Sequence, residues 1–169
     1  MKKIISEKLP RILRNKKKLE KELNVKITNK GIDVSVEGES VDEYIAEKVI
    51  DAINFGFPLT DALMIKSEDF AFEIISIKDY TTKRDFSRIR ARIIGKGGKT
   101  LRLLKELAGC GFELKNNSIG IIGDPENIKN AESAVISIIK GTKHANVYSY
   151  LEKHKSEPIL DLGLKDKFK

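Results

Sequence analysis

Residues 91–101 read Ala-Arg-Ile-Ile-Gly-Lys-Gly-Gly-Lys-Thr-Leu, and this stretch decides which fold the sequence predicts. Three glycines are interleaved with Lys96 and followed by Lys99. Glycine adopts backbone dihedrals that other residues avoid, and it lets another molecule approach the main chain. The stretch is typical of a helix end, a four-residue glycine loop and the start of a second helix. Backbone N–H groups at a helix start attract anions, so the two lysines beside them predict a phosphate-binding turn.

Two kinds of phosphate site compete for this turn, beside an ordinary glycine-rich turn. A nucleoside-triphosphate loop has the form G-x-x-x-x-G-K-[ST]; residues 98–100 match its end, but Ile93 stands where its first glycine belongs. The G-x-x-G loop of a KH domain lies between two short helices and binds about four nucleotides of single-stranded nucleic acid by the backbone. Residues 95–98 fit that form, with Ile93 and Ile94 just ahead as an apolar surface for bases.

Positive charge is concentrated rather than mixed with negative charge. Residues 1–26 carry ten Lys and Arg against three Glu, and residues 81–105 carry nine against one Asp. Residues 27–80 carry four against twelve acidic side chains, and residues 106–169 are balanced. One of the two basic blocks contains the glycine loop, which indicates a polyanionic partner. A solubilising surface remains an alternative for the N-terminal block.

Composition excludes several classes of protein. The 169 residues are 40% hydrophobic and 34% charged, so the chain can bury a core in one domain or two small ones. We expect no signal peptide and no membrane span. The single Cys110 suits a reducing cytoplasm and rules out an internal disulfide framework. With only His144 and His154, no zinc ligand set can be assembled, and neither a cofactor nor a catalytic residue is predicted.

The first half of the chain predicts strand, helix, helix, strand, strand, helix. Residues 25–28 and 31–36 alternate at period two around an expected turn at Asn29-Lys30. Ser40 to Glu43 has the S-x-x-E form of a capping box at the start of a helix. The buried face of that helix is expected to contain Val41, Tyr44, Ile45, Val49, Ala52 and Ile53.

The second half predicts the same order of elements. A strand over residues 70–77 precedes a basic helix over 86–94, the glycine loop and an apolar-faced helix. A hairpin turns at Asn116-Asn117, and Asp124-Pro125 starts the last long helix with a side-chain cap and a proline.

The two halves repeat with an offset of 81 to 87 residues. Residues 11–13 (Arg-Ile-Leu) align with 92–94 (Arg-Ile-Ile), the turn at 29–32 aligns with 116–119, and Gly56 aligns with Gly141. Such a repeat is strong support for the fold. The first copy has Arg14-Asn15-Lys16-Lys17 in place of the glycine loop, so we expect an auxiliary contact or a protein-docking face there.

With these motifs the chain resembles the two-KH family of small-subunit ribosome-assembly proteins, often called partner of Nob-one or Dim-two, in its archaeal form. Besides the loop, the matching segments are 56–57, 61–63, 72–74, 77–79, 121–123, 127–131 and 147–151. The resemblance implies an α+β fold of two tandem type I KH domains, each a three-stranded antiparallel sheet backed by three helices, with a C-terminal helical extension. The expected boundaries are 1–68 for a degenerate KH domain, 69–150 for the KH domain with the loop, and 151–169 for a tail.

The resemblance also implies binding to the 3′ region of small-subunit rRNA during subunit assembly. It implies contacts with the Nob-one endonuclease and with the alpha subunit of translation initiation factor two. Alternatives are a KH adaptor of an RNA-degrading complex, a generic RNA-binding regulator and, less favoured, a nucleotide-triphosphate hydrolase.

The loop and its surroundings supply the expected RNA contacts. Backbone N–H groups and lysines would hold phosphates, while apolar side chains, with Leu101 or Leu104 among them, would form a shallow groove for bases. Arg84 and other arginines would extend the positive field along the strand. The predicted RNA-binding residues are Arg88, Arg90, Arg92, Ile93, Ile94, Gly95, Lys96, Gly97, Gly98, Lys99, Arg102 and Leu114.

Overall fold

The structure is a computed structural model that describes residues 1–67 and 69–155. The first half contains, in order, β1 (Lys2–Ile5), α1 (Leu9–Arg14), α2 (Lys16–Leu23), β2 (Lys26–Lys30), β3 (Asp33–Glu37), α3 (Ser40–Phe55), α4 (Leu59–Leu63) and the 3₁₀ turn η1 (Met64–Lys66). The second half contains β4 (Ala71–Ser76), the 3₁₀ turn η2 (Ile77–Tyr80), α5 (Phe86–Ile94), the 3₁₀ turn η3 (Lys96–Gly98), α6 (Lys99–Ala108), β5 (Gly111–Lys115), β6 (Ser118–Gly123), α7 (Pro125–Ile139) and α8 (His144–Lys153).

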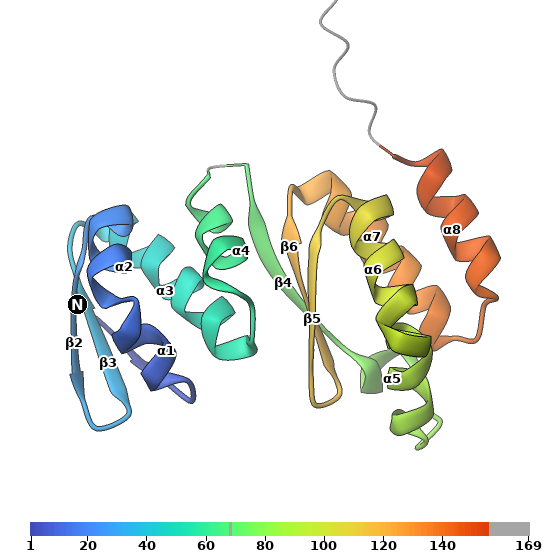
Figure 1. Cartoon of the computed structure of the whole chain (residues 1–169), viewed down its shortest axis with the longest axis horizontal. Coiled ribbons are helices and arrows are strands. Elements are labelled where there is room, and N and C mark those ends of the chain that lie inside the picture. Colours follow the sequence, from blue (N-terminus) through green and yellow to red (C-terminus); the bar gives the residue numbers. More distant parts are fainter. Residues whose placement is uncertain (68, 156–169) are drawn as a thin grey trace, which may run out of the picture.

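Each half has one antiparallel sheet with its helices on one face (Figure 1). The strand orders are β1-β3-β2 and β4-β6-β5, so the last strand of each half lies in the centre of its sheet. The two sheets have the same strand register. Lys3 pairs with Ser35 in the first sheet, and Ile74 pairs with Gly120 at the equivalent position of the second sheet. The predicted α+β fold, with β-α-α-β-β-α order in both halves, is confirmed.

The turn of the first hairpin differs from the prediction. β2 continues through Lys30, which pairs with Asp33, so the turn consists of Gly31 and Ile32. Gly31 has φ +62°, a left-handed conformation that glycine adopts at little cost. The expected turn at Asn29-Lys30 was therefore two residues too early, because the conformational need of Gly31 outweighed the polarity of the asparagine and lysine.

The start of α3 also differs. The cap residue is Glu39, which makes no side-chain capping hydrogen bond, and Ser40 is already helical. Glu43 accepts a hydrogen bond from the Gly38 N–H and forms an ion pair with the Met1 amino group. The predicted capping box is therefore wrong, because Ser40 does not cap the helix and Glu43 accepts from the Gly38 N–H instead of the Ser40 N–H. The expected helical face was partly wrong too, because Val41 and Tyr44 are exposed.

Helix α8 lies on α6 and α7 at the end of the molecule farthest from the first sheet (Figure 1). Val147 and Leu151 are both buried in the second core. The helix therefore crosses the boundary that the sequence predicted at residue 150. The remainder of the expected tail, from residue 156, lies outside the described residues.

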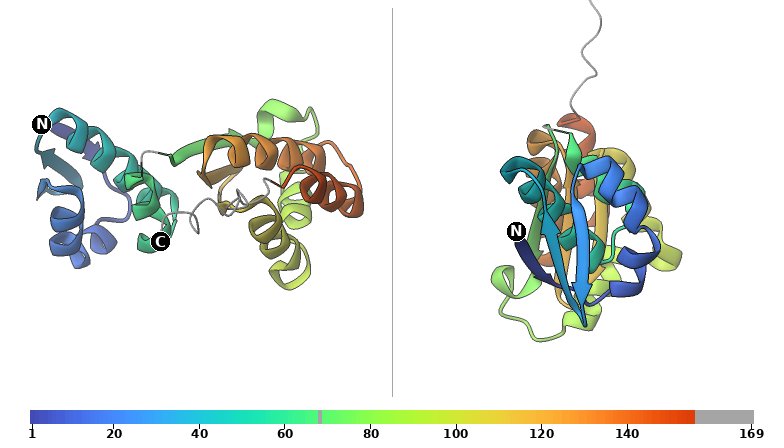
Figure 2. Two further views of the ribbon diagram at one scale, coloured as in Figure 1. Left: turned by 90° about the horizontal axis from the view of Figure 1, so that it is seen from above. Right: turned by 90° about the vertical axis from the view of Figure 1, so that its left-hand side faces the viewer.

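The two halves are stacked so that the C-terminal end of α3, together with α4 and η1, lies against the outer face of the second sheet. The outer face of the first sheet is open at the end of the molecule (Figure 2). Phe55, Phe57 and Phe72 form a cluster between the halves, with ring centroids 5.6 to 6.0 Å apart. A Cβ at Gly120 would lie 2.8 Å from carbon atoms of both Phe55 and Phe57. The corresponding position in the first sheet is Ser35, which is half-buried, and none of the aromatic ring contacts found within residues 1–67 and 69–155 involves that sheet.

In each half, an arginine on the first helix (α1 or α5) contacts the end of a long helix (α3 or α7). Arg92 donates to the carbonyl oxygens of Ile138 and Thr142, at 2.7 and 2.8 Å. Arg11 donates to the carbonyl oxygens of residues 56–57, at 3.2 and 3.4 Å. The aligned arginines thus hold the backbone at and just beyond the C-terminal ends of α7 and α3.

Replacing Gly120 by Ala tests the stacking of the halves. Alanine normally stabilises a strand by about 0.5–1 kcal/mol relative to glycine. Here its methyl group meets two phenyl rings, so we expect a loss of about 1–3 kcal/mol in the free energy of unfolding, measured with denaturant. Ser35→Ala is the control at the open sheet and should change stability little. Equal or higher stability of Gly120→Ala would contradict this packing.

The structural role of Arg92 is tested by Arg92→Gln. Loss of two charged hydrogen bonds should lower the free energy of unfolding by about 1.5–3 kcal/mol. Arg88→Gln, one helical turn earlier, removes a side chain that has no partner among the described residues and should change stability by less than about 0.5 kcal/mol. Equal effects of the two substitutions would contradict the role assigned to Arg92.

Candidate nucleic-acid interface

The turn between α5 and α6 is built on a close approach between its first glycine and Thr100. Gly95 has φ +75°, and a Cβ there would collide with the Thr100 hydroxyl and lie 2.7 Å from the Thr100 backbone nitrogen. Gly97 and Gly98 have φ +61° and +77°, and a Cβ at either would meet no atom within 4 Å. The first glycine is required for the fold of the turn, whereas the other two leave their backbone open to solvent.

The two lysines of the loop have no protein partner. Lys96 and Lys99 are exposed, and within the described part of the chain neither ammonium group makes a hydrogen bond or an ion pair. The loop therefore combines bare backbone with two uncommitted positive charges, which is the chemistry needed to hold phosphates.

The surface next to the loop is a strip between α6 and β5. Leu101 on α6 and Leu114 on β5 are half-buried against the second core, and β5 is an edge strand. One edge of β5 is therefore not paired within its sheet and presents backbone polar groups. Half-buried apolar side chains beside such an edge can contact base faces and base edges together.

Two of the apolar residues proposed for the groove are not accessible. Ile93 and Leu104 are fully buried in the second core, so their side chains cannot contact a base in this structure. Ile94 is 38% exposed and remains available. The first half has the same pair of a buried and an exposed apolar residue, with Ile12 buried and Leu13 40% exposed. Because the first half has no glycine loop, this pattern of burial is a property of the fold and not of the loop.

The predicted arginines do not form one row along the loop. Arg102 donates to the Gly97 carbonyl at 3.4 Å, so it stays beside the loop. Arg90 donates to the carbonyl of Asn116 at 3.3 Å and thus joins α5 to the hairpin. Arg88 and Arg92 lie on another face, in a pocket of about 320 Å³ between α5 and the end of α7. Arg84 is exposed in the polar connection before α5.

The structural role of Arg92 was missed at the level of sequence, although a signal for it was present. Arg11 is aligned with Arg92 in a half that lacks the glycine loop. Because the first half has this arginine but no glycine loop, the arginine is expected to have a role in the fold. The hydrogen bonds from Arg11 and Arg92 to backbone carbonyls agree with that role.

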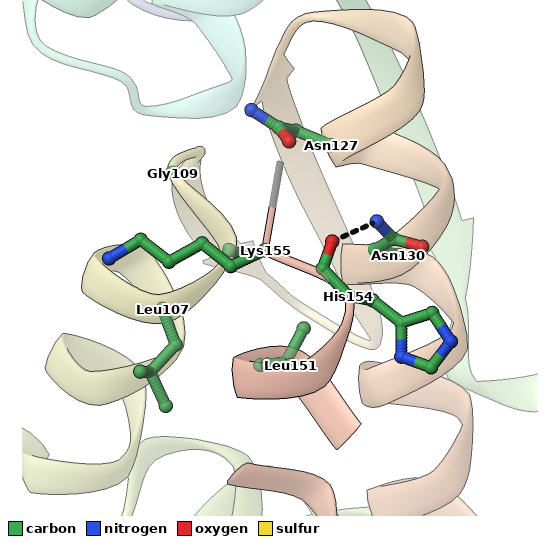
Figure 3. A pocket seen from close by; sticks show the side chains of 8 residues that line it. Leu107, Gly109, Asn127, Asn130, Leu151, His154 and Lys155 are labelled. Carbon is green, nitrogen blue, oxygen red and sulfur yellow. Dashed lines mark hydrogen bonds between the residues drawn. The ribbon is translucent and has the colours of Figure 1, made fainter. Parts of the chain in front are cut away.

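The second half has a further small pocket behind α6, away from the glycine loop (Figure 3). Leu107, Asn130 and Leu151 line it, and the Asn130 amide donates to the His154 carbonyl at 3.2 Å. Its volume is only about 70 Å³, which is too small for a nucleotide. The pocket is a gap left where α8 packs against α6 and α7.

Three other features would indicate a different function in residues 1–67 and 69–155: a metal site, a membrane-spanning helix or a reactive thiol. No group of three or more His, Cys, Asp or Glu side chains could hold a metal ion there. None of the helices there is both long and apolar enough to cross a membrane. Burial raises the pKa of the Cys110 thiol to about 12, so the thiol stays neutral and is a poor nucleophile.

Comparison with known sequences identifies the second half. A family model for the second KH domain of PNO1 proteins, described as eukaryotic type KH-domain (KH-domain type I), matches residues 71–156. A KH domain-containing protein of Methanocaldococcus jannaschii is 32% identical over 151 residues, which are 84% of this chain and 66% of the relative. The pre-rRNA-processing protein PNO1 of Debaryomyces hansenii is 31% identical over 140 residues, 79% of this chain and 54% of the relative. The chain thus spans less than two thirds of the length of these relatives.

Solved structures match both halves together. Dim2p of Pyrococcus horikoshii has a TM-score of 0.81 at 26% identity, covering 90% of this chain and 98% of that one. A chain in the a/eIF2alpha-aDim2p-rRNA complex of the same organism has a TM-score of 0.80 at 28% identity, covering 91% and 93%. The chain therefore belongs to the PNO1/Dim2 family of KH-domain proteins, and its two β-α-α-β-β-α units form a tandem KH arrangement.

Proposed function

We propose that this chain is a non-catalytic protein that binds single-stranded RNA through the loop at residues 95–98, and that this RNA is the 3′ region of small-subunit rRNA during subunit assembly. The observation that carries the proposal is the open backbone at Gly97 and Gly98, flanked by the uncommitted charges of Lys96 and Lys99. A phosphate can reach the main chain there without meeting a side chain.

The proposed strand would run from the loop along α6 and β5. Its phosphates would contact the two lysines and the N–H groups of Lys96 and Gly97, with Arg102 beside them, because the N–H groups of Gly98 and Lys99 donate to carbonyls within the turn. Its bases would face Ile94, Leu101 and Leu114, and their edges would meet the backbone of the edge strand β5. Ile93 is not part of this proposed surface, because it is buried, and Arg92 would act through the fold.

The relatives support the choice of RNA. Debaryomyces PNO1 is named a pre-rRNA-processing protein, and the Pyrococcus structure is a complex of aDim2p with rRNA and a/eIF2alpha. By that likeness we propose the alpha subunit of translation initiation factor two as a partner in the cytoplasm. The Nob-one endonuclease is proposed from the family resemblance alone.

The first half would serve a different role. Asn15 alone separates α1 from α2, so no glycine loop is available to approach a phosphate backbone. We propose that residues 1–68 form a degenerate KH domain with an auxiliary or protein-docking surface. Residues from 69 through the end of α8 would form the RNA-binding domain, because the second core continues to Leu151.

The loop is tested by combining Lys96→Asp with Gly97→Asp. The two carboxylates would repel phosphates where the strand approaches most closely, so we expect RNA binding to be lost in a fluorescence anisotropy titration. Thermal stability should change little, since both residues are exposed and Asp tolerates a left-handed backbone. Lys129→Asp with Ser133→Asp on the exposed surface of α7 makes the same change in net charge and should keep most of the affinity. Retained affinity in the loop variant would refute the proposal.

The salt dependence of binding tests the number of phosphate contacts. If three to five phosphates are neutralised on a single strand, the logarithm of the association constant should fall against the logarithm of salt concentration with a slope of about −2 to −3.5. Binding titrations at several salt concentrations between about 50 and 200 mM would measure this slope, because affinity for nucleic acid changes steeply over that range. A flat dependence would show that binding does not use the phosphates.

A further inference from the structure

A pocket of about 380 Å³ lies where the two halves meet, at the end of α6 farthest from the glycine loop. We call it the junction pocket. The first half supplies the carboxylate of Asp61 and the thioether of Met64. The aromatic ring of Phe70 comes from the connection just before β4. The second half supplies the ammonium group of Lys105 and two positions on its sheet, Gly111 and Ile122.

The junction pocket continues the strip that begins at the glycine loop. Leu101 and Lys105 are four residues apart on α6 and so lie on one face of the helix. α6 has ten residues, which corresponds to about 15 Å at 1.5 Å per residue. β5 follows α6 and runs back along it, so Gly111 lies at the end of the strip away from the loop. A strand held at the loop would therefore reach the junction pocket just beyond the few nucleotides that a KH domain binds.

Two opposite charges in the junction pocket are uncommitted. Within the described residues, neither the Asp61 carboxylate nor the Lys105 ammonium group makes a hydrogen bond or an ion pair. A Cβ at Gly111 would lie 3.6 Å from Asp61 Oδ2, so the carboxylate lies close to the first residue of β5. A carboxylate repels phosphate but accepts hydrogen bonds from the exocyclic amino group of a base.

The other walls are suited to the face of a base. Met64 is 48% exposed, and Phe70 is half-buried against the first core. Aromatic and apolar side chains stack on bases of any sequence, whereas a carboxylate beside them distinguishes bases by their donors. An ammonium group at the rim adds an attraction for the adjoining phosphate.

We propose that the junction pocket binds one unstacked base of the RNA strand, at the position that follows the segment held by the glycine loop. Met64 and Phe70 contact the base face, Asp61 accepts from an exocyclic amino group, and Lys105 contacts the neighbouring phosphate. The pocket thus favours adenine, cytosine or guanine over uracil. This inference rests on the RNA binding proposed above.

Base preference is tested by selecting bound molecules from a pool of random ten-nucleotide RNAs with the full chain and sequencing them. Among the bound RNAs we expect one position, next to the nucleotides held by the glycine loop, at which uracil is about fivefold less frequent than in the starting pool. A factor of that size corresponds to one good base contact. Asp61→Asn should remove that depletion and leave the other positions unchanged. Glu39→Gln, an exposed substitution with the same change in charge at the distant start of α3, should keep it.

Occupancy is tested separately with Met64→Cys and a maleimide reagent. Cys110 is 7% exposed and its pKa is about 12, so the reagent should label only the introduced thiol. A saturating ten-nucleotide RNA should slow labelling about fivefold or more, whereas a saturating four-nucleotide RNA should not. Val41→Cys, 69% exposed on α3, should be labelled at the same rate with either RNA.

The outcomes separate this inference from the function on which it rests. If the loop variant abolishes RNA binding but Asp61→Asn keeps the base pattern and the RNA leaves labelling unchanged, the junction pocket does not hold RNA. This inference alone is then overturned. If the unaltered chain enriches no RNA, both the function and the inference are overturned.

Discussion

The close contact between Gly95 and Thr100 is the constraint on which the RNA-binding surface depends. Since no side chain fits between them, α6 starts directly against the end of α5, and the chain must reverse through Gly97 and Gly98 in left-handed conformations. That reversal leaves backbone exposed at the tip of the turn and sets Lys96 and Lys99 beside it.

A second contact links the halves and gives the molecule its shape. Because Gly120 has no side chain, Phe55 and Phe57 lie on the outer face of the second sheet, a face that is open in the first sheet. This stacking brings α4 and the residues before β4 to the end of β5. A strip that would otherwise end at Gly111 is thereby extended by side chains of the first half. The first half, which has no glycine loop, can thus contribute to RNA recognition because its side chains lie at the end of the strip between α6 and β5.

The fold was predictable from local signals, and the site only in part. The glycine loop and the Asp124-Pro125 helix start each act over a few residues, and the repeat shows the same succession of such signals twice. All three were confirmed by the elements observed. The turn at Gly31-Ile32 was misplaced because one glycine's left-handed conformation decided it. The burial of Ile93 and the carbonyl contacts of Arg92 depend on α7, more than 40 residues away, so periodicity could not separate them from RNA contacts. The junction pocket requires the stacking of two units, which no local pattern encodes.

The most direct test of the central claim is ultraviolet crosslinking of the purified chain to cellular RNA, followed by mass spectrometry of the crosslinked peptides. The account predicts adducts on peptides that contain the glycine loop and β5, and RNA reads from the 3′ region of small-subunit rRNA. Adducts confined to residues 1–26 or to the open face of the first sheet would contradict it, because RNA would then be bound by the basic N-terminal block without the loop.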